Sequence, residues 1–271
     1  MYTLKISVSI DLQYAHDKTL FDKLADADIR DIELVLCAHW REDIAVQEAY
    51  LRGLEQGVES FLAQGVRIRS VHIPFGPFWD FCRLNEAERS ACVARTLALE
   101  KRLKPYTIPY LVVHTNGNDF PADGNRDKGI ASLRRSLAEL GACDSMTVCV
   151  ENLPRNCLGN TSEEMLRIVD GLPVACTFDV NHVFLESIPH FVEALGPRIK
   201  TLHVSDADTI DEKHWLPGDG TIDFQSFVEA LEHIGYTGTF NYETHNTPDS
   251  DFTDLRHRHD LIFSEYNRCR S

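Results

Sequence analysis

The chain has 271 residues, a formal net charge of −15, 43% hydrophobic residues and 25% charged residues. This length lies near the roughly 250 residues of a (β/α)8 barrel, and the composition excludes the disordered and fibrous classes. The acidic balance disfavours nucleic acid as a partner. No apolar run reaches the ~18 residues of a membrane span and no signal peptide is recognisable, so we expect a cytoplasmic protein with no membrane partner.

Eight short runs rich in β-branched and aromatic residues follow one another along the chain. They lie at residues 4–10, 31–36, 67–73, 110–115, 146–152, 173–180, 200–205 and 239–244. Short runs of this composition, bounded by turn residues, are typical of strands in a parallel sheet.

Segments with helical signals separate these runs. They lie at residues 19–27, 42–65, 85–103, 126–141, 161–171, 187–196, 223–235 and 251–267. Asp17 and Thr161 stand where N-caps are expected, and Gly141 and Gly196 stand where helices should end. Because strands and helices alternate without a long linker, we predict that residues 1–271 form a single (β/α)8 TIM barrel. An open doubly wound sheet is the alternative, but no GxGxxG follows the first strand.

Ionisable side chains end six consecutive predicted strands, the third to the eighth. In chain order they are His72, His114, Glu151, Asp179 with His182, His203 with Asp206, and Glu243 with His245. The carboxyl ends of barrel strands meet at one mouth, where three carboxylates would repel one another without a cation among them. Three carboxylates and one imidazole suit Mn²⁺ or Mg²⁺ and tolerate Co²⁺ or Zn²⁺, so we expect a divalent metal ion as cofactor.

Six short motifs, IEL, VENLP, FDVNH, LHVSD, HWLPGDGTIDF and YET, occur in this order between about Leu4 and Glu243. Their order and spacing resemble the xylose-isomerase-like barrel superfamily. That superfamily includes ketose epimerases, hydroxypyruvate and sugar-phosphate isomerases, inosose dehydratases and apurinic-site endonucleases. The resemblance implies a single metal ion held by Glu151, Asp179, His203 and Glu243.

In the epimerase and isomerase branches, the resemblance implies that Glu151 and Glu243 also move the proton through an enediolate. We therefore expect a metal-dependent isomerase or epimerase acting on a small sugar or sugar phosphate. His182 matches a position that contacts substrate oxygens in these relatives. The other expected substrate contacts are His72, His114, Glu33, Trp40 and His214.

Two interpretations of loop residues accompany this expectation. Aromatic and histidine side chains could form the wall of a sugar-sized pocket, with ordinary packing as the alternative. They are His39, Trp40, Phe75, Phe78 and Trp79. In HWLPGDGTIDF, we interpret the glycines as a tight turn and Asp223 as a helix cap, not as a phosphate-binding loop.

The principal alternative is an apurinic-site endonuclease with three zinc ions. The resemblance supplies a candidate for each of nine ligands: His72, His114, Glu151, Asp179, His182, His203, Glu212, His214 and Glu243. Against it, Glu212 stands where an Asp is usual, the DNA-contacting loops are not recognisable, and the chain is acidic. An inosose dehydratase-type lyase and a barrel that binds without turnover are further alternatives. The sequence leaves open which sugar is used, how many metal ions bind and how many subunits assemble.

Overall fold

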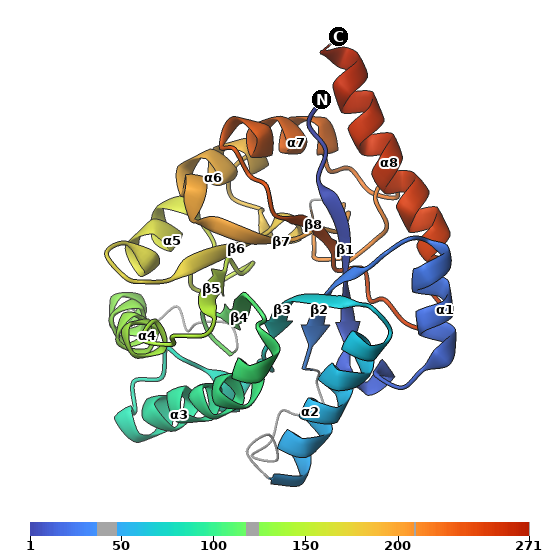
Figure 1. Ribbon diagram of the computed structural model, residues 1–271. Helices are drawn as coiled ribbons and strands as arrows, with labels where there is room; N and C mark the ends of the chain where they lie inside the picture. Colours follow the sequence, from blue (N-terminus) through green and yellow to red (C-terminus); the bar gives the residue numbers. More distant parts are fainter. Residues whose placement is uncertain (37–47, 118–124, 209, 271) are drawn as a thin grey trace.

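The computed structural model describes residues 1–36, 48–117, 125–208 and 210–270. Within these residues, eight parallel strands form a barrel with helices around it (Figure 1). The strands are β1 (Lys5–Asp11), β2 (Asp31–Val35), β3 (Arg67–His72), β4 (Tyr110–His114), β5 (Thr147–Glu151), β6 (Ala175–Asp179), β7 (Ile199–His203) and β8 (Thr239–Tyr242).

The strands pair in the order β7-β6-β5-β4-β3-β2-β1-β8, and every pair is parallel. Between β7 and β8 the described residues form a single bridge, Val204 to Tyr242. The Val204 amide donates to the Asn241 carbonyl at 2.8 Å, and the Glu243 amide donates to the Val204 carbonyl at 2.9 Å. The barrel is therefore nearly closed, which confirms the predicted (β/α)8 fold and excludes the open doubly wound sheet.

The helices follow the strands in alternation. They are α1 (Lys18–Asp26), α2 (Glu48–Ala63), α3 (Glu86–Leu103), α4 (Arg126–Leu140), α5 (Ser162–Val169), α6 (Ile188–Leu195), α7 (Phe224–His233) and α8 (Phe252–Cys269). The Asp17 and Thr161 side chains accept hydrogen bonds from the Leu20 and Glu164 amides, which confirms both predicted caps. Among the helices just given, none is both long and apolar enough to cross a bilayer.

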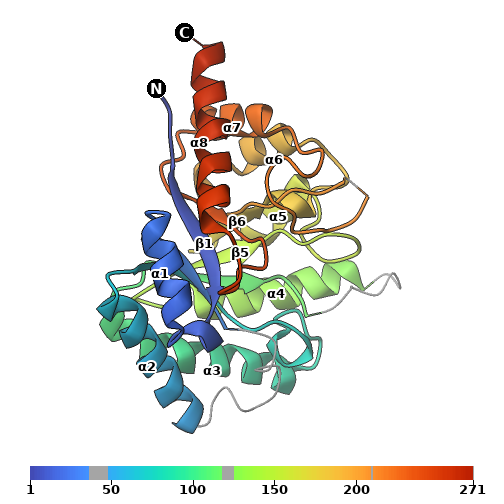
Figure 2. The same ribbon diagram turned by 90° about the vertical axis from the view of Figure 1, so that its right-hand side faces the viewer.

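The chain ends meet at one end of the molecule, where α8 runs beside β1 (Figures 1 and 2). The Tyr2 amide donates to Asn267 Oδ1 at 2.9 Å, and Asn267 Nδ2 donates to the Tyr2 carbonyl at 2.8 Å. The last helix is thus tied to the segment that precedes β1, which helps to close the ring of helices.

The apolar core lies between the strands and the helices. Phe178 of β6, for example, packs edge-on against Phe191 of α6, with ring centroids 5.4 Å apart. The barrel interior near the carboxyl ends of the strands contains polar side chains instead, including Ser9, Ser70 and Asn241, all of them buried. Polar side chains that can donate or accept hydrogen bonds therefore lie inside the barrel at this end.

Two register shifts adjust which residues lie opposite one another. Arg69 in β3 has no paired residue in β2, and Lys200 in β7 has no paired residue in β6. After the second shift, Asp179 lies opposite His203. Such bulges re-aim side chains and are common next to active sites.

Candidate functional site

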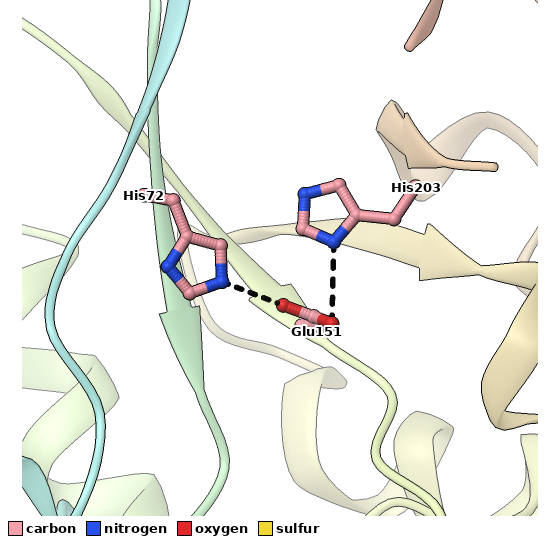
Figure 3. Close-up of side chains that lie close together, drawn as sticks. All are labelled: His72, Glu151 and His203. Atoms are coloured by element: carbon pink, nitrogen blue, oxygen red, sulfur yellow. Dashed lines mark hydrogen bonds and ion pairs between the residues drawn. The ribbon is translucent and has the colours of Figure 1, made fainter. Parts of the chain in front are cut away.

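Glu151, Asp179, His203 and Glu243 gather at the carboxyl ends of β5, β6, β7 and β8, and we call them the strand-end cluster. Each offers a ligand atom, and these atoms all lie within 4.8 Å of one another. His203 Nδ1 lies 3.2 Å from Glu151 Oε1 (Figure 3). The same nitrogen lies 3.5 Å from Glu243 Oε2 and 3.8 Å from Asp179 Oδ2. Three members are fully buried, whereas the Glu243 side chain is 21% exposed.

Buried polar atoms in this cluster lack hydrogen-bond partners. Asp179 Oδ2 and His203 Nδ1 are buried, and neither makes a hydrogen bond within the part of the chain that the structure describes. Such atoms are costly unless a partner satisfies them, and a divalent cation would do so for carboxylate and imidazole together. The donor set of three carboxylates and one imidazole fits Mn²⁺ or Mg²⁺ best and tolerates Co²⁺ or Zn²⁺.

The pKa shifts of the carboxyl groups in the strand-end cluster also favour a bound cation. Burial, together with the neighbouring Glu243 and Glu151 carboxylates, raises the pKa of Asp179 to about 7. Burial alone would also raise the pKa of Glu151, but the His203 and His114 imidazoles hold it well below its usual range. A group of carboxylates that retains a proton near neutrality is one in which a divalent ion can replace that proton.

His72 and His114 contact the other oxygen of Glu151. Their Nε2 atoms lie 3.2 Å and 3.3 Å from Glu151 Oε2. His72 Nδ1 donates to the Ile73 carbonyl at 2.8 Å, which directs Nε2 to Glu151, and the His72 ring stacks on that of His203 with centroids 5.5 Å apart (Figure 3). Burial alone would lower the pKa of His72, but the Glu151 and Glu33 carboxylates raise it to about 9.

His182 and His214 meet at Glu212 on the far side of the cluster. His182 Nε2 and His214 Nε2 lie 3.4 Å and 3.3 Å from Glu212 Oε1. Each ring donates its Nδ1–H to a backbone carbonyl, His182 to Asn152 at 2.9 Å and His214 to Glu243 at 2.8 Å. All nine predicted zinc ligands therefore surround one space.

The nine residues do not form three equally compact groups, however. Among the described residues, two sets bring their ligand atoms within 4.8 Å of one another: the strand-end cluster, and His72 with Glu151 and His203. Neither set contains His114, His182, Glu212 or His214. The geometry is therefore most compact around the strand-end cluster.

A cavity of about 480 Å³ opens over the cluster. Apolar side chains such as Val35, Phe75 and Leu153 form part of its wall, and the Phe75 ring stacks on His114 with centroids 5.0 Å apart. The volume falls in the range of small-molecule sites. The predicted substrate contacts His72, His114, His182 and His214 all line it.

Of the aromatic residues predicted for the cavity wall, one lines the cavity and another packs in the core. Phe75 lines the cavity, but Trp79, in the short helix η4 (Pro77–Trp79), is fully buried in the core. Phe78 is exposed and is not one of the lining residues. His39 and Trp40 lie outside the described residues.

Glu33, predicted to contact substrate, lies below the cavity instead. Its side chain is 1% exposed, it is absent from the described lining, and its Oε1 lies 2.9 Å from His203 Nε2. Because Glu33 is enclosed by barrel-interior side chains, the structure does not place it in reach of a molecule in the cavity.

Two cavity residues, Arg155 and His245, were not among the predicted metal ligands or substrate contacts, although the sequence already placed His245 at the end of the eighth strand. Both have left-handed backbone conformations, with φ of 55° and 52°, as does His214 at 51°. Such conformations are uncommon outside glycine and occur preferentially at functional sites. Arg155 directly follows VENLP, four residues beyond Glu151, so its place just after a strand end is the signal that points to it.

The loop after β7 is organised by Asp206. Its buried carboxylate accepts hydrogen bonds of 2.8 to 3.0 Å from the amides of Ala207, Gly218, Gly220 and Ile222. The loop amides are thus already occupied by a carboxylate, which supports a structural turn over a phosphate-binding loop. Asp223 accepts from the Gln225 and Ser226 amides, which confirms it as the cap of α7.

Comparison with known proteins agrees with this architecture. A D-tagatose 3-epimerase-like protein has a TM-score of 0.77 at 22% identity, covering 99% of this chain and 100% of that one. D-psicose 3-epimerase, crystallised in the presence of D-fructose, has a TM-score of 0.70 at 17% identity, covering 97% and 99%. L-ribulose 3-epimerase has a TM-score of 0.73 at 15% identity, covering 99% and 96%.

Sequence comparison identifies the family. An uncharacterized protein of Methanocaldococcus jannaschii is 30% identical in an alignment over 194 residues, and the match covers 68% of this chain and 68% of that one. The model of the family described as xylose isomerase-like TIM barrel matches residues 21–263. The chain therefore belongs to the xylose isomerase-like TIM barrel family, as its motifs predicted.

Proposed function

We propose that the protein is a divalent-metal-dependent sugar isomerase or epimerase. The observation that carries this proposal is the strand-end cluster, three carboxylates and a histidine within 4.8 Å of one another, beside a cavity of about 480 Å³. Structural neighbours named as sugar epimerases support it, and one of them was crystallised in complex with D-allulose.

Glu151 and Glu243 are the proposed proton-transfer residues. A bound divalent ion would supply Lewis-acid polarisation of the substrate carbonyl and the neighbouring hydroxyl. One glutamate takes the proton from the carbon beside the carbonyl, and the C–H electron pair moves into the enediolate of the sugar. Returning a proton to the opposite face of that carbon restores the carbonyl and gives the epimer. Returning it to the former carbonyl carbon, while the proton of the neighbouring hydroxyl moves to the former carbonyl oxygen, gives the isomer. No electrons are gained or lost.

The histidines around the cavity are the proposed contacts for sugar hydroxyls. His182 and His214 use Nδ1 on backbone carbonyls, so each ring is oriented with Nε2 on the Glu212 side. His72 and His114 line the same cavity next to Glu151. Trp40 stays a predicted contact.

The test is solvent exchange. We expect the Mn²⁺-loaded protein to incorporate deuterium from D₂O into a ketose at the carbon next to the carbonyl. Glu151→Gln and Glu243→Gln should each lower this rate by about 10²- to 10⁴-fold with the fold retained, since the barrel core does not depend on either residue. Glu100→Gln, which changes a buried glutamate of α3, is the matched control and should leave the rate unchanged.

Near-wild-type exchange in either variant would remove that glutamate from proton transfer. No exchange with any ketose would favour a barrel that binds without turnover, and loss of water from an inosose would identify a lyase.

A multi-zinc phosphodiesterase is the second candidate, because all nine predicted zinc ligands lie around one space. Two metal ions there could stabilise the attacking and leaving oxygens of a phosphodiester. We expect elemental analysis to find about one divalent ion per chain, as the compact strand-end cluster suggests. Three zinc ions per chain, with cleavage of an abasic duplex, would place the phosphodiesterase first.

A further inference from the structure

His203 lies between carboxylates on both sides of its ring. Nδ1 faces the strand-end cluster, 3.2 Å from Glu151 and 3.5 Å from Glu243, while Nε2 lies 2.9 Å from Glu33 Oε1. We propose that Glu33 is a positioning residue that receives the Nε2 proton of His203 in a hydrogen bond and so presents Nδ1 as the metal-binding nitrogen. This inference rests on the proposed metal-dependent function and extends it to a residue outside the ligand set.

Glu33 is itself held in place through both oxygens. Oε1 accepts from the Ser9 hydroxyl at 3.1 Å, and Oε2 accepts from the Ser70 hydroxyl at 2.7 Å. The Ser9 oxygen in turn accepts from the Asn241 side-chain amide at 2.8 Å. These residues are all buried, so hydroxyl donors from β1 and β3 restrain the carboxylate, and Asn241 of β8 holds the Ser9 hydroxyl in turn.

A register shift builds this arrangement. In β1 and β2, Ser9 lies opposite Glu33, and the bulge in β3 brings Ser70 opposite Glu33 on the other side. In an uninterrupted ladder, Arg69 would occupy that position. The skipped residue therefore aligns two hydroxyl donors across three neighbouring strands, with the carboxylate between them.

The chemistry of imidazole explains what this arrangement achieves. A neutral ring carries one proton, and an acceptor at one nitrogen determines which nitrogen keeps a lone pair for a metal. A carboxylate partner also fixes the ring orientation and makes the ligand nitrogen more basic. His203 is fully buried, so among the described residues Glu33 is the group placed to do this at Nε2.

The test is metal affinity. Protein stripped with EDTA is titrated calorimetrically with Mn²⁺, as wild type and as Glu33→Gln, Ser70→Ala and the control Glu100→Gln. We expect Glu33→Gln to weaken Mn²⁺ binding by about 10- to 100-fold, Ser70→Ala to weaken it less, and Glu100→Gln to leave it unchanged. Visible spectra of the Co²⁺-loaded proteins should shift for Glu33→Gln alone, because the His203 ligand is then reoriented.

Mn²⁺ affinity of Glu33→Gln within about threefold of wild type, with the fold intact, would overturn the inference. If Glu33→Gln does not fold, unchanged Mn²⁺ affinity in Ser70→Ala overturns it instead. Failure of the proposed function is distinguishable, since wild type would then bind no Mn²⁺ in the first titration.

Discussion

The strand-end cluster and the loop that follows β7 each contain a buried aspartate, and the two carboxylates have very different surroundings. Asp206 accepts hydrogen bonds from four backbone amides. Asp179 accepts one, from the Asn181 amide at 2.7 Å, and in the described part of the chain its Oδ2 accepts none. Burial is the same, so it does not separate a structural acid from a ligand. The difference lies in whether the oxygens are satisfied.

Exchanging each aspartate for asparagine is the strongest test of this comparison. Asp206→Asn replaces one acceptor oxygen by an NH₂ group facing amide donors, so we expect a loss of about 3–5 kcal/mol in the free energy of unfolding. Asp179→Asn relieves repulsion among carboxylates, so the metal-free protein should change by less than about 1 kcal/mol while Mn²⁺ affinity falls at least about 100-fold. Urea unfolding in EDTA and Mn²⁺ titration measure the two effects.

Equal destabilisation by the two substitutions would contradict the comparison. So would Mn²⁺ binding at wild-type affinity in Asp179→Asn.

Gly220→Ala tests how closely the loop packs on Asp206. A Cβ at this position would lie 2.4 Å from both the Ala207 carbonyl oxygen and Asp206 Oδ1. We expect a loss of about 2–3 kcal/mol, measured by urea unfolding. Gly53→Ala in α2 is the matched control, because nothing lies within 4 Å of its Cβ, and it should stabilise the protein by up to about 1 kcal/mol.

The pH dependence of stability sharpens the contrast at the cluster. Burial opposes protonation of the surrounding histidines, but nearby carboxylates raise the pKa of His72 and His214 to about 9 and that of His182 to about 10. A raised pKa gives stability that is full below the unfolded value, about 6.5, and is lost as the pH rises through the folded value. In EDTA, the melting temperature should therefore fall by about 5 °C between pH 7 and pH 10.

Mn²⁺ should remove most of that fall, because the ion replaces the protonated imidazoles as the positive charge among the carboxylates. A melting temperature that rises with pH in EDTA would show that the histidines are not protonated in this way.

Asp223→Ala should have the smallest effect on the free energy of unfolding among these substitutions. It removes the side chain that caps α7, so we expect a loss of about 1 kcal/mol with Mn²⁺ affinity unchanged. Asp223→Asn keeps a capping oxygen and should stay within a few tenths of a kcal/mol of wild type. A change in Mn²⁺ affinity in Asp223→Ala would show that the loop and the cluster are coupled.

Most of the fold and the strand-end cluster could be predicted because both depend on short-range patterns. Apolar runs mark the strands, and the residue that ends each run must lie at the barrel mouth, as Glu151 and Asp179 do. That residues 1–271 form one domain stays a prediction.

The remaining features depend on which strand lies beside which. The pairing of Glu33 with Ser70 depends on the bulge at Arg69, and the role of Asp206 follows from contacts with amides up to 16 residues further along the chain. Trp79 was hard to assign because a large aromatic side chain near a strand end can face either the cavity or the core. The spacing of residues along the chain does not determine which of these two directions the side chain takes.

Because β7 and β8 are paired incompletely, the proposed ion would also help to hold these two strands together. The strand order begins with β7 and ends with β8, and among the described residues a single bridge, Val204 to Tyr242, joins the two. His203 ends β7, and Glu243 directly follows β8. An ion bound by both residues would cross-link the carboxyl ends of β7 and β8. Loss of the ion would leave the backbone hydrogen bonds of Val204 to join the two strands, so we expect the barrel to persist in EDTA but to open more easily between β7 and β8 than elsewhere.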